Sequence, residues 1–243
     1  MRLIVIGSSS AGNGYILRGE NESLILEAGC RLSEVKKALD YDIASISGLL
    51  VTHQHQDHAG FLNEYTHAGI QAYSSLETFQ LRRQTYNCNI VAPGKSFHVG
   101  GFLVLPFAVV HDVINYGYLI HHQECGKVCF ITDSMYSPAV FKGLNQIILE
   151  ANYSETIIQD RLYKGSLNPA QYNRIRESHM SFENAMMFLG ANDLRAVNNI
   201  VLIHLSDGNS NALKFQEEIQ KMTGKSVHIA DKNTIIELSK TPF

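Results

Sequence analysis

The sequence predicts an α+β protein in which two packed β-sheets carry helices on their outer faces. Apolar, β-branched runs alternate with amphipathic stretches along all 243 residues, which indicates strands and helices in mixed order. Strands with short connections dominate the first half, and strands return between helices in the second half. No low-complexity linker interrupts the chain, and its five prolines are scattered. We therefore expect a single domain over residues 1–243.

Ten segments have the length and composition of strands, and turn residues separate them. The first lies at the N-terminus, where an apolar core of four or five residues is too short for a signal peptide or a membrane span. We therefore expect a cytoplasmic protein with no membrane partner. The predicted strands are Arg2–Ile6, Gly14–Leu17, Ser23–Glu27, Leu49–Thr52, Phe102–Val110, Tyr116–Ile120, Val128–Thr132, Gln146–Glu150, Ile200–Ile203 and Thr234–Leu238.

Four segments have a helical apolar period and residues that mark helix ends. Ser33 and Ser181 are the expected N-caps, because a serine hydroxyl can accept a hydrogen bond from a free N–H of the first turn. Gly224 is the expected end of the last helix, since glycine readily adopts the left-handed conformation. The predicted helices are Glu34–Leu39, Phe61–His67, Phe182–Leu189 and Leu213–Met222.

Charge and cysteine content restrict the function classes. The formal net charge is −3, whereas a protein that grips long nucleic acid usually carries a basic excess. Any basic surface must therefore be local, and a small or short substrate fits equally well. The four cysteines include no CxxC pair, so we interpret them as reduced thiols. A disulfide between Cys125 and Cys129 is the alternative.

Residues 52–58, which read THQHQDH, give the strongest chemical signal. If His53 and His55 continue the strand before them, their side chains point to the same side. A turn into the following helix would let the side chains of Asp57 and His58 point to a position next to that of His53 and His55. Imidazole and carboxylate are ligands for zinc, manganese and iron. A solvated polar loop is the alternative, but three histidines within six positions argue against it.

Four apolar strands each run into a residue that can bind a metal, namely His53, His111, Asp133 or His204. Functional sites in sheet proteins gather where strand ends converge. Two metals could share the resulting ligands, with Asp133 as the bridge. His111 or His204 alone could equally be a core or capping histidine, so their common position at strand ends carries the argument. The seven candidate ligands are His53, His55, Asp57, His58, His111, Asp133 and His204.

These motifs resemble, in the same order, those of the metallo-β-lactamase superfamily. They are HxHxDH at residues 53–58, HD at 111–112, TD at 132–133 and HLS at 204–206. The segments GSSSAGN, EAG, SHMS and HLSDGNS narrow the resemblance to the WalJ/YycJ-type branch, whose members resemble exonucleases, and to phage or prophage relatives of that branch. The resemblance covers essentially the whole chain.

The resemblance implies an αββα fold, a four-layer sandwich of two mixed β-sheets flanked by helices, with a dinuclear metal site at one edge. It implies two divalent metal ions, zinc most often, with manganese as the alternative in nuclease branches. The first metal would be held by His53, His55 and His111. The second would be held by Asp57, His58 and His204, with Asp133 bridging.

Two such metals would generate hydroxide from water near neutral pH and would clamp the oxygens of a phosphoryl group. Asp57 is a candidate catalytic residue that orients the nucleophile while it ligates. His179 precedes the expected N-cap Ser181, and it could protonate the leaving oxygen or bind phosphate. A helix-entry histidine without a catalytic role is the alternative for His179.

Two further segments are candidates for substrate binding. The loop from Gly7 to Gly14 could hold an anion, although such loops more often only turn between strands. Its candidate residues are Ser8, Ser9, Ser10 and Asn13. Residues 161–176 contain no acid and combine basic with tyrosine side chains, which suits phosphates and stacked bases. A solvated face is an equal alternative for Arg161, Tyr163, Lys164, Tyr172, Arg174 and Arg176.

The function that these patterns favour is hydrolysis of phosphodiesters in nucleic acid, as by an exonuclease. A small-molecule hydrolase is the alternative: a cyclic nucleotide phosphodiesterase, a thioesterase, a lactonase or a lactamase. A non-enzymatic binding protein is disfavoured, because it would tolerate loss of Asp57 or Asp133, and both are present. A nuclease should have a basic groove leading to the metals, whereas a small-molecule enzyme should have a closed, partly apolar pocket.

Overall fold

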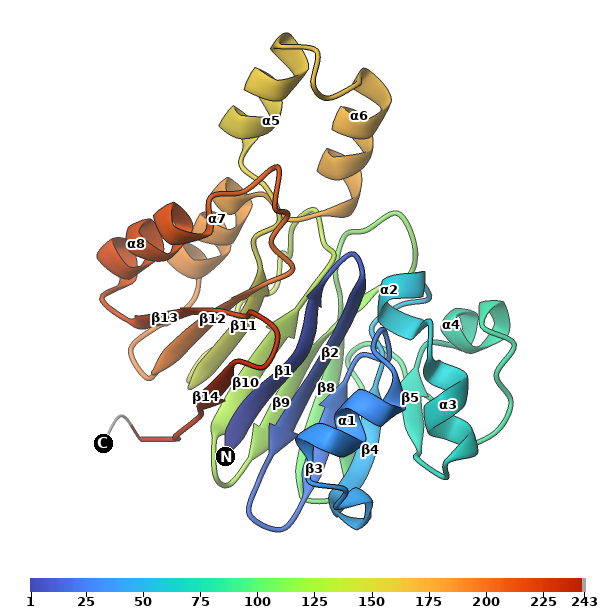
Figure 1. Ribbon diagram of the computed structural model, residues 1–243. Coiled ribbons are helices and arrows are strands. Elements are labelled where there is room, and N and C mark those ends of the chain that lie inside the picture. The colour runs from blue at the N-terminus through green and yellow to red at the C-terminus, as the bar shows by residue number, and fades with distance from the viewer. Residues whose placement is uncertain (242–243) are drawn as a thin grey trace.

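Two seven-stranded mixed sheets pack face to face in the computed structural model, which describes residues 1–241 (Figure 1). Sheet A has the strand order β14-β1-β2-β3-β4-β5-β6, and sheet B has the order β13-β12-β11-β10-β9-β8-β7. The strands of sheet A are β1 Arg2–Ser9, β2 Gly12–Arg18, β3 Ser23–Leu26, β4 Ile46–Leu50, β5 Ala72–Ser74, β6 Cys88–Ile90 and β14 Ile235–Glu237. Those of sheet B are β7 Phe97–Val99, β8 Phe102–Ala108, β9 Tyr116–His122, β10 Gly126–Ile131, β11 Gln146–Glu150, β12 Asn199–Ile203 and β13 Ser226–Ile229.

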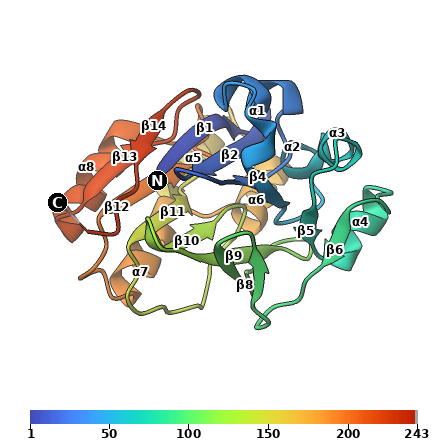
Figure 2. The same cartoon turned by 90° about the horizontal axis from the view of Figure 1, so that it is seen from below.

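Helices cover the outer faces of both sheets, which gives the predicted four layers. Side chains such as Val35 and Tyr65 pack helices against the outer face of sheet A, and Phe188 and Phe215 do so on sheet B. Figure 2 shows α1 and α7 on opposite sides of the sheets. The helices are α1 Leu32–Ala38, α2 Gln56–Ala59, α3 Leu62–His67, α4 Leu76–Leu81, α5 Glu155–Tyr163, α6 Pro169–Ser178, α7 Phe182–Ala191 and α8 Ala212–Thr223, and a 3₁₀ turn spans Ile43–Ser45.

The αββα prediction is confirmed, and all ten predicted strands are present. The strands that the sequence did not predict, β5, β6, β7 and β13, have only three or four residues each. Such short runs are too brief to show a period. The predicted loop from Gly7 to Gly14 is wrong, because β1 and β2 continue through it as a tight hairpin with Ser9 paired to Gly12.

Two of the three predicted helix ends are confirmed. Ser181 caps α7 by accepting a hydrogen bond from the backbone N–H of Asn184, and Gly224 ends α8 in the left-handed conformation. Ser33 is not an N-cap, because α1 already begins at Leu32. The side chain of Glu64 from α3 accepts the hydrogen bond of the Leu32 N–H at 3.0 Å, so a carboxylate from a neighbouring helix serves this helix end.

The cysteines are free thiols, as the sequence indicated. Cys125 packs between the two sheets, whereas Cys129 packs on the outer face of sheet B. The alternative disulfide between them is therefore absent. Within residues 1–241, no helix has both the length and the apolar character that a membrane crossing requires.

Helices α5 and α6 form an arm that projects from one end of the sheets (Figure 1). The tip of the β1–β2 hairpin lies at the same end (Figure 1). Tyr153, Ile158 and Leu167 form a small apolar cluster of the arm, and Tyr172 and Ile175 of α6 pack against it. The Arg161 guanidinium donates to the carbonyls of Gly208 at 3.1 Å and Ser166 at 3.2 Å, and so fastens α5 to the segment before α8.

Tyr118 joins the two sheets directly below the histidine motif. Its buried hydroxyl, on β9 of sheet B, donates a 2.8 Å hydrogen bond to the carbonyl of Val51, two residues before His53. This bond ties the end of β4 in sheet A to the opposite sheet. It therefore helps to fix the position of the histidine motif relative to the two sheets.

We expect Tyr118→Phe to lower the free energy of unfolding by about 1 kcal/mol, which is typical for loss of one buried hydrogen bond. The measurement is urea unfolding followed by circular dichroism. Tyr163→Phe is the matched control, because the Tyr163 side chain is 92% exposed and its change should be close to zero. Equal unfolding midpoints for the two variants would contradict a stabilising role for the inter-sheet bond.

Candidate metal centre

Three histidines from two segments form a first cluster. His53 follows β4, His55 is the N-cap residue of α2, and His111 follows β8. Nδ1 of His55 lies 3.0 Å from Nε2 of His53 and 3.3 Å from Nε2 of His111. The hydroxyl oxygen of Thr52 lies 2.9 Å from Nδ1 of His53 and can accept a hydrogen bond from the N–H at that position. Nε2 of His53 is then left with a free lone pair toward the cluster.

Asp57, His58 and His204 form a second cluster around the carboxylate of Asp133. Nε2 of His58 lies 3.1 Å from Oδ1 of Asp133 and 3.3 Å from Oδ2 of Asp57. Nδ1 of His204 lies 2.6 Å from the same oxygen of Asp133. Asp133 also belongs to the first cluster, so one carboxylate joins the two.

The donor atoms fit divalent metal ions. Within each cluster, one possible ligand atom from every residue lies within 4.8 Å of the others. Tetrahedral coordination with bonds of about 2.1 Å places neighbouring ligand atoms about 3.4 Å apart, close to the spacing of the first cluster. Nε2 of His204 is buried and has no hydrogen-bond partner, which a bound cation would explain. Imidazole and carboxylate together suit zinc or manganese.

The backbone turns sharply where strands deliver these residues. Asp133 follows β10 with φ of 40°, and His204 follows β12 with φ of 52°, conformations that are uncommon outside glycine. Buried amide side chains hold both turns: Asn115 donates to the carbonyl of Asp133, and Asn152 donates to that of His204 at 2.7 Å. The structure therefore stabilises strained backbone at the positions that present the ligands.

The segment Glu27–Gly29 supports the second cluster from behind. The buried carboxylate of Glu27 lies 3.6 Å from Nδ1 of His58, on the side of the ring that faces away from Asp133. The N–H of Ala28 donates to the carbonyl of His58 at 2.7 Å. A Cβ at Gly29 would lie 1.7 Å from the carbonyl oxygen of Asp57. Only glycine therefore permits this close approach.

Glu150 is a site residue to which sequence reasoning gave no role. It lies fully buried at the end of β11, with its carboxylate 2.8 Å from Nδ1 of His179 and 3.4 Å from Nδ1 of His204. Its other oxygen accepts hydrogen bonds from the N–H groups of Ser134 and Met180. The signal was available, because Gln146–Glu150 is another apolar strand that ends in an ionisable residue.

His179 is brought to the site by the short connection between α6 and α7, as the sequence predicted. It is the C-cap residue of α6, and its side chain is 19% exposed. Nδ1 lies 3.7 Å from Asp133 as well as 2.8 Å from Glu150. His179 therefore sits at the edge of the second cluster with one ring nitrogen held by a buried carboxylate.

The buried charges determine each other's protonation. Burial lowers the pKa of His53 well below its ordinary value, and the nearby His58 adds to this effect. Burial also opposes protonation of His204, but Asp133 and Glu150 outweigh it and raise the pKa of His204 to about 10. Burial raises the pKa of the Asp133 carboxyl, but His204 and His58 outweigh it and hold that pKa well below its usual range. Asp133 is therefore an anion at neutral pH, and cations bound here would replace ring protons.

A cavity of about 270 Å³ opens onto the clusters, and we call it the metal cavity. Acidic side chains of Asp57 and Asp133 line one part of it, and exposed Arg174 of α6 lines another. It is neither a broad basic groove nor a closed apolar pocket, so it matches neither of the two sites expected from the sequence. Its lining residues are Ser10, His55, Gln56, Asp57, Asp112, Asp133, Arg174, Ser178 and His179.

Of the four loop residues predicted to bind substrate, Ser10 lines the metal cavity. Asn13 is fully buried, and its amide contacts Oδ2 of Asp57 at 3.4 Å and Nε2 of His58 at 3.1 Å. The Ser8 hydroxyl accepts hydrogen bonds from the Tyr15 hydroxyl and the His204 N–H, both at 2.9 Å. In this arrangement Asn13 and Ser8 support the ligands.

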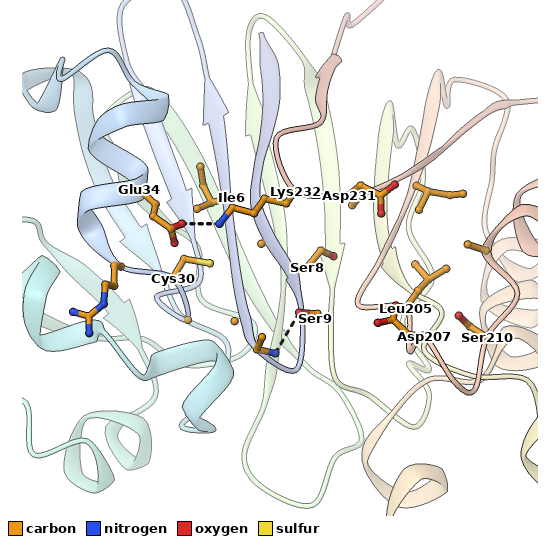
Figure 3. A pocket seen from close by; sticks show the side chains of 18 of the residues that line it. Ile6, Ser8, Ser9, Cys30, Glu34, Leu205, Asp207, Ser210, Asp231 and Lys232 are labelled. Atoms are coloured by element: carbon orange, nitrogen blue, oxygen red, sulfur yellow. Dashed lines mark hydrogen bonds and ion pairs between the residues drawn. The ribbon is translucent and has the colours of Figure 1, made fainter. Parts of the chain in front are cut away.

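Ser8 and Ser9 line a separate cavity of about 690 Å³ on the other side of the β1–β2 hairpin. Figure 3 shows their side chains there with those of Cys30, Asp207 and Ser210. Lys232 and Glu34 form a 2.6 Å ion pair across this cavity (Figure 3). The predicted ligands of the metal centre lie outside its wall, so this larger cavity is distinct from the metal site.

The basic segment 161–176 divides into residues with different surroundings. Arg161 is held by backbone carbonyls, Lys164 pairs with Asp160 at 2.6 Å, and Arg176 pairs with Glu155 at 3.1 Å. Arg174 forms no ion pair with any residue of the described range 1–241. It is therefore the cation of this segment that is free to meet a ligand at the metal cavity.

Comparisons with known proteins agree with this fold. The family described as "Beta-lactamase superfamily domain" matches residues 28–205. The chain is 24% identical over 220 residues to an exodeoxyribonuclease, YycJ, of Bacillus anthracis, across 85% of this chain and 83% of that protein.

Solved structures also share the fold, and two of them cover nearly the whole chain. The metallo-β-lactamase fold protein YhfI of Bacillus subtilis superimposes with a TM-score of 0.71 at 17% identity, covering 97% of this chain and 99% of that one. Zn²⁺-bound PqqB of Methylobacterium extorquens gives a TM-score of 0.71 at 12% identity, covering 98% and 100%. Because the family model matches more than half of its length, the chain belongs to the β-lactamase superfamily, as a metal-dependent hydrolase of the metallo-β-lactamase fold.

Proposed function

We propose that this protein is a phosphodiesterase that cleaves nucleic acid with two divalent metal ions. The observation that carries the proposal is that two donor clusters share Asp133. A pair of cations a few ångströms apart supplies an activated water and neutralises the charge of a phosphoryl group. Similarity to a bacterial exodeoxyribonuclease supports nucleic acid as the substrate class.

Zinc is the proposed metal, and manganese is the second candidate. His53, His55 and His111 would hold one ion, and Asp57, His58 and His204 the other, with Asp133 between them. The nitrogen-rich first cluster favours zinc, which binds imidazole well. The zinc bound in PqqB, which has the same fold, supports this assignment.

Two side chains of this protein would act at the reacting phosphate, and each is held by a buried neighbour. Asp57 would orient the attacking water, while the buried amide of Asn13 holds one of its oxygens at 3.4 Å. With hydroxide as the nucleophile, its oxygen would bond to phosphorus as the ester P–O bond breaks, and the departing oxygen would take a proton from protonated His179. Glu150 holds Nδ1 of His179 at 2.8 Å, so the other ring nitrogen is left for the substrate.

The projecting α5–α6 arm would guide a nucleic-acid strand. Arg174 lines the metal cavity, where its guanidinium could bind a phosphate oxygen next to the reacting one. Tyr163 lies at the end of α5, and its ring is 92% exposed, as expected of a side chain that stacks on an unpaired base. These residues would bind backbone and bases without reading sequence.

A small-molecule hydrolase is the second candidate, and the net charge of −3 favours it. The decisive experiment presents the metal-loaded protein with labelled single- and double-stranded DNA, RNA, cyclic nucleotides and bis(p-nitrophenyl) phosphate. We expect cleavage of a nucleic acid. Cleavage of cyclic nucleotides alone, or of the generic diester alone, would contradict the nuclease proposal.

In the same assay we expect Asp133→Ala to abolish hydrolysis and to lower the metal bound per chain, because both clusters lose their common carboxylate. Metal content is measured by plasma mass spectrometry after dialysis. Asp160→Ala is the control, since Asp160 is an exposed acid on α5 that pairs with Lys164. Retained turnover in Asp133→Ala would refute the metal assignment.

His179→Ala should affect substrates according to their leaving group. We expect a loss of about 10²-fold or more in kcat for DNA, whose alkoxide leaving oxygen needs a proton. The loss for bis(p-nitrophenyl) phosphate should be much smaller, because p-nitrophenolate leaves without one. Steady-state kinetics on both substrates, at equal metal content, measure the difference. Equal losses would show that His179 does not protonate the leaving group.

A further inference from the structure

A second hollow lies beside the metal centre on the side of His111, and the mechanism above does not use it. This His111 hollow has a volume of about 590 Å³ and adjoins the metal cavity at Asp112, which lines both. His111 lines the hollow while its Nε2 faces His55 in the first cluster. A chemical group bound in the hollow would therefore lie next to a phosphate bound at the metals.

The wall of the His111 hollow is largely apolar. Val109, Val113 and Ile114 line it from the segment after β8, and Leu81 lines it from the end of α4. Leu81 is 65% exposed and Ile114 is 44% exposed. Covering these side chains with a flat apolar group would remove their surface from water, which is favourable. The volume lies within the usual range for ligand pockets.

Two residues that line the hollow carry hydrogen-bond acceptors without a partner. The amide oxygens of Gln54 and Asn115, both lining residues, are buried without a hydrogen-bond partner. Buried polar atoms are nearly always paired, so two such atoms at one hollow require an explanation. Gln54 is only partly buried, and rotation of its side chain would present the amide to a ligand. Its oxygen would accept from an N–H group on the edge of that ligand.

The charges around the hollow oppose an anion. Glu77 lines the hollow alone, and Asp112, 46% exposed, lines both the hollow and the metal cavity, whereas Arg174 lines the metal cavity on its other side. A further phosphate of a strand would therefore be repelled from the His111 hollow and attracted toward Arg174. An uncharged aromatic ring that carries N–H donors matches the hollow better.

We infer that the His111 hollow binds the nucleobase of a nucleotide whose phosphate is hydrolysed. The apolar side chains of Leu81, Val113 and Ile114 cover the base, and the amide of Gln54 accepts a hydrogen bond from its edge. The strand continues from the metals toward Arg174. This inference rests on the proposed function. It adds a binding site for one nucleobase, on a defined side of the reacting phosphate.

The test compares single-stranded hexathymidylate with two analogues that carry an abasic residue at the 5′ or the 3′ terminal nucleotide. Products are separated by chromatography, with the zinc-loaded enzyme. We expect one analogue to be cleaved with a kcat/KM about tenfold lower than the full substrate, in line with loss of one base contact. The other analogue should lose less.

The variant Ile114→Ala tests whether the His111 hollow causes the preference for the full over the abasic substrate. Ile235→Ala is the control, because Ile235 is a 56% exposed isoleucine on β14 that does not line the hollow. We expect Ile114→Ala to reduce the ratio between full and abasic substrate at least threefold, and Ile235→Ala to preserve it. An unchanged ratio in Ile114→Ala, or equal cleavage of all three substrates by the wild-type protein, would overturn the inference and leave the nuclease proposal standing. Hydrolysis of none of the three would overturn the inference, and the nuclease proposal falls with it if the enzyme also cleaves none of the other DNA and RNA substrates of the first assay.

Discussion

The whole arrangement depends on one buried carboxylate, that of Asp133, which lies between two groups of imidazoles. A charge with 2% of its surface exposed is costly unless it is paired. Here His58 and His204 contact one of its oxygens directly. Although burial opposes it, Asp133 and Glu150 raise the pKa of His204 to about 10, so a ring proton helps to balance this charge. Divalent cations would balance it with stronger interactions, so affinity for metal follows from the same burial.

Keeping Asp133 in this place requires both sheets. Sheet A delivers the histidine motif from the end of β4, and sheet B delivers Asp133, Glu150 and His204 from the ends of β10, β11 and β12. Because β10, β11 and β12 are parallel neighbours, their carboxyl ends lie at one edge of the sheet. The apolar core between the sheets then holds the two sets of ligands opposite each other, so the packing sets the geometry of the centre.

Much of the fold and site could be predicted from local pattern. Strands of five or more residues show an apolar run, and a ligand directly after such a run is visible in the sequence, as for His53, Asp133 and His204. Features that depend on distant partners were not predictable in this way. The start of α1 is set by Glu64 from another helix, which accepts a hydrogen bond from the Leu32 N–H. The helix therefore begins before Ser33, the expected N-cap. Ser8 and Asn13 appeared to be loop residues, yet strand pairing turns them toward the ligands.

Charge composition was also a weak guide to the surface near the site. The chain has a net charge of −3, and in its basic segment 161–176 Lys164 and Arg176 are each paired with an acid. Only the fold shows that Arg174 is the cation left at the metal cavity and that acidic and apolar side chains occupy the other side. This asymmetry, rather than total charge, provides a direction for a bound strand.

The most direct test of the shared carboxylate is a crystal structure of the zinc-loaded protein with anomalous data collected on both sides of the zinc edge. We expect two peaks about 3.5 to 4 Å apart, one beside His53, His55 and His111, the other beside Asp57, His58 and His204, with Asp133 in contact with both. A single peak, or two peaks of which one lies away from Asp133, would contradict the account.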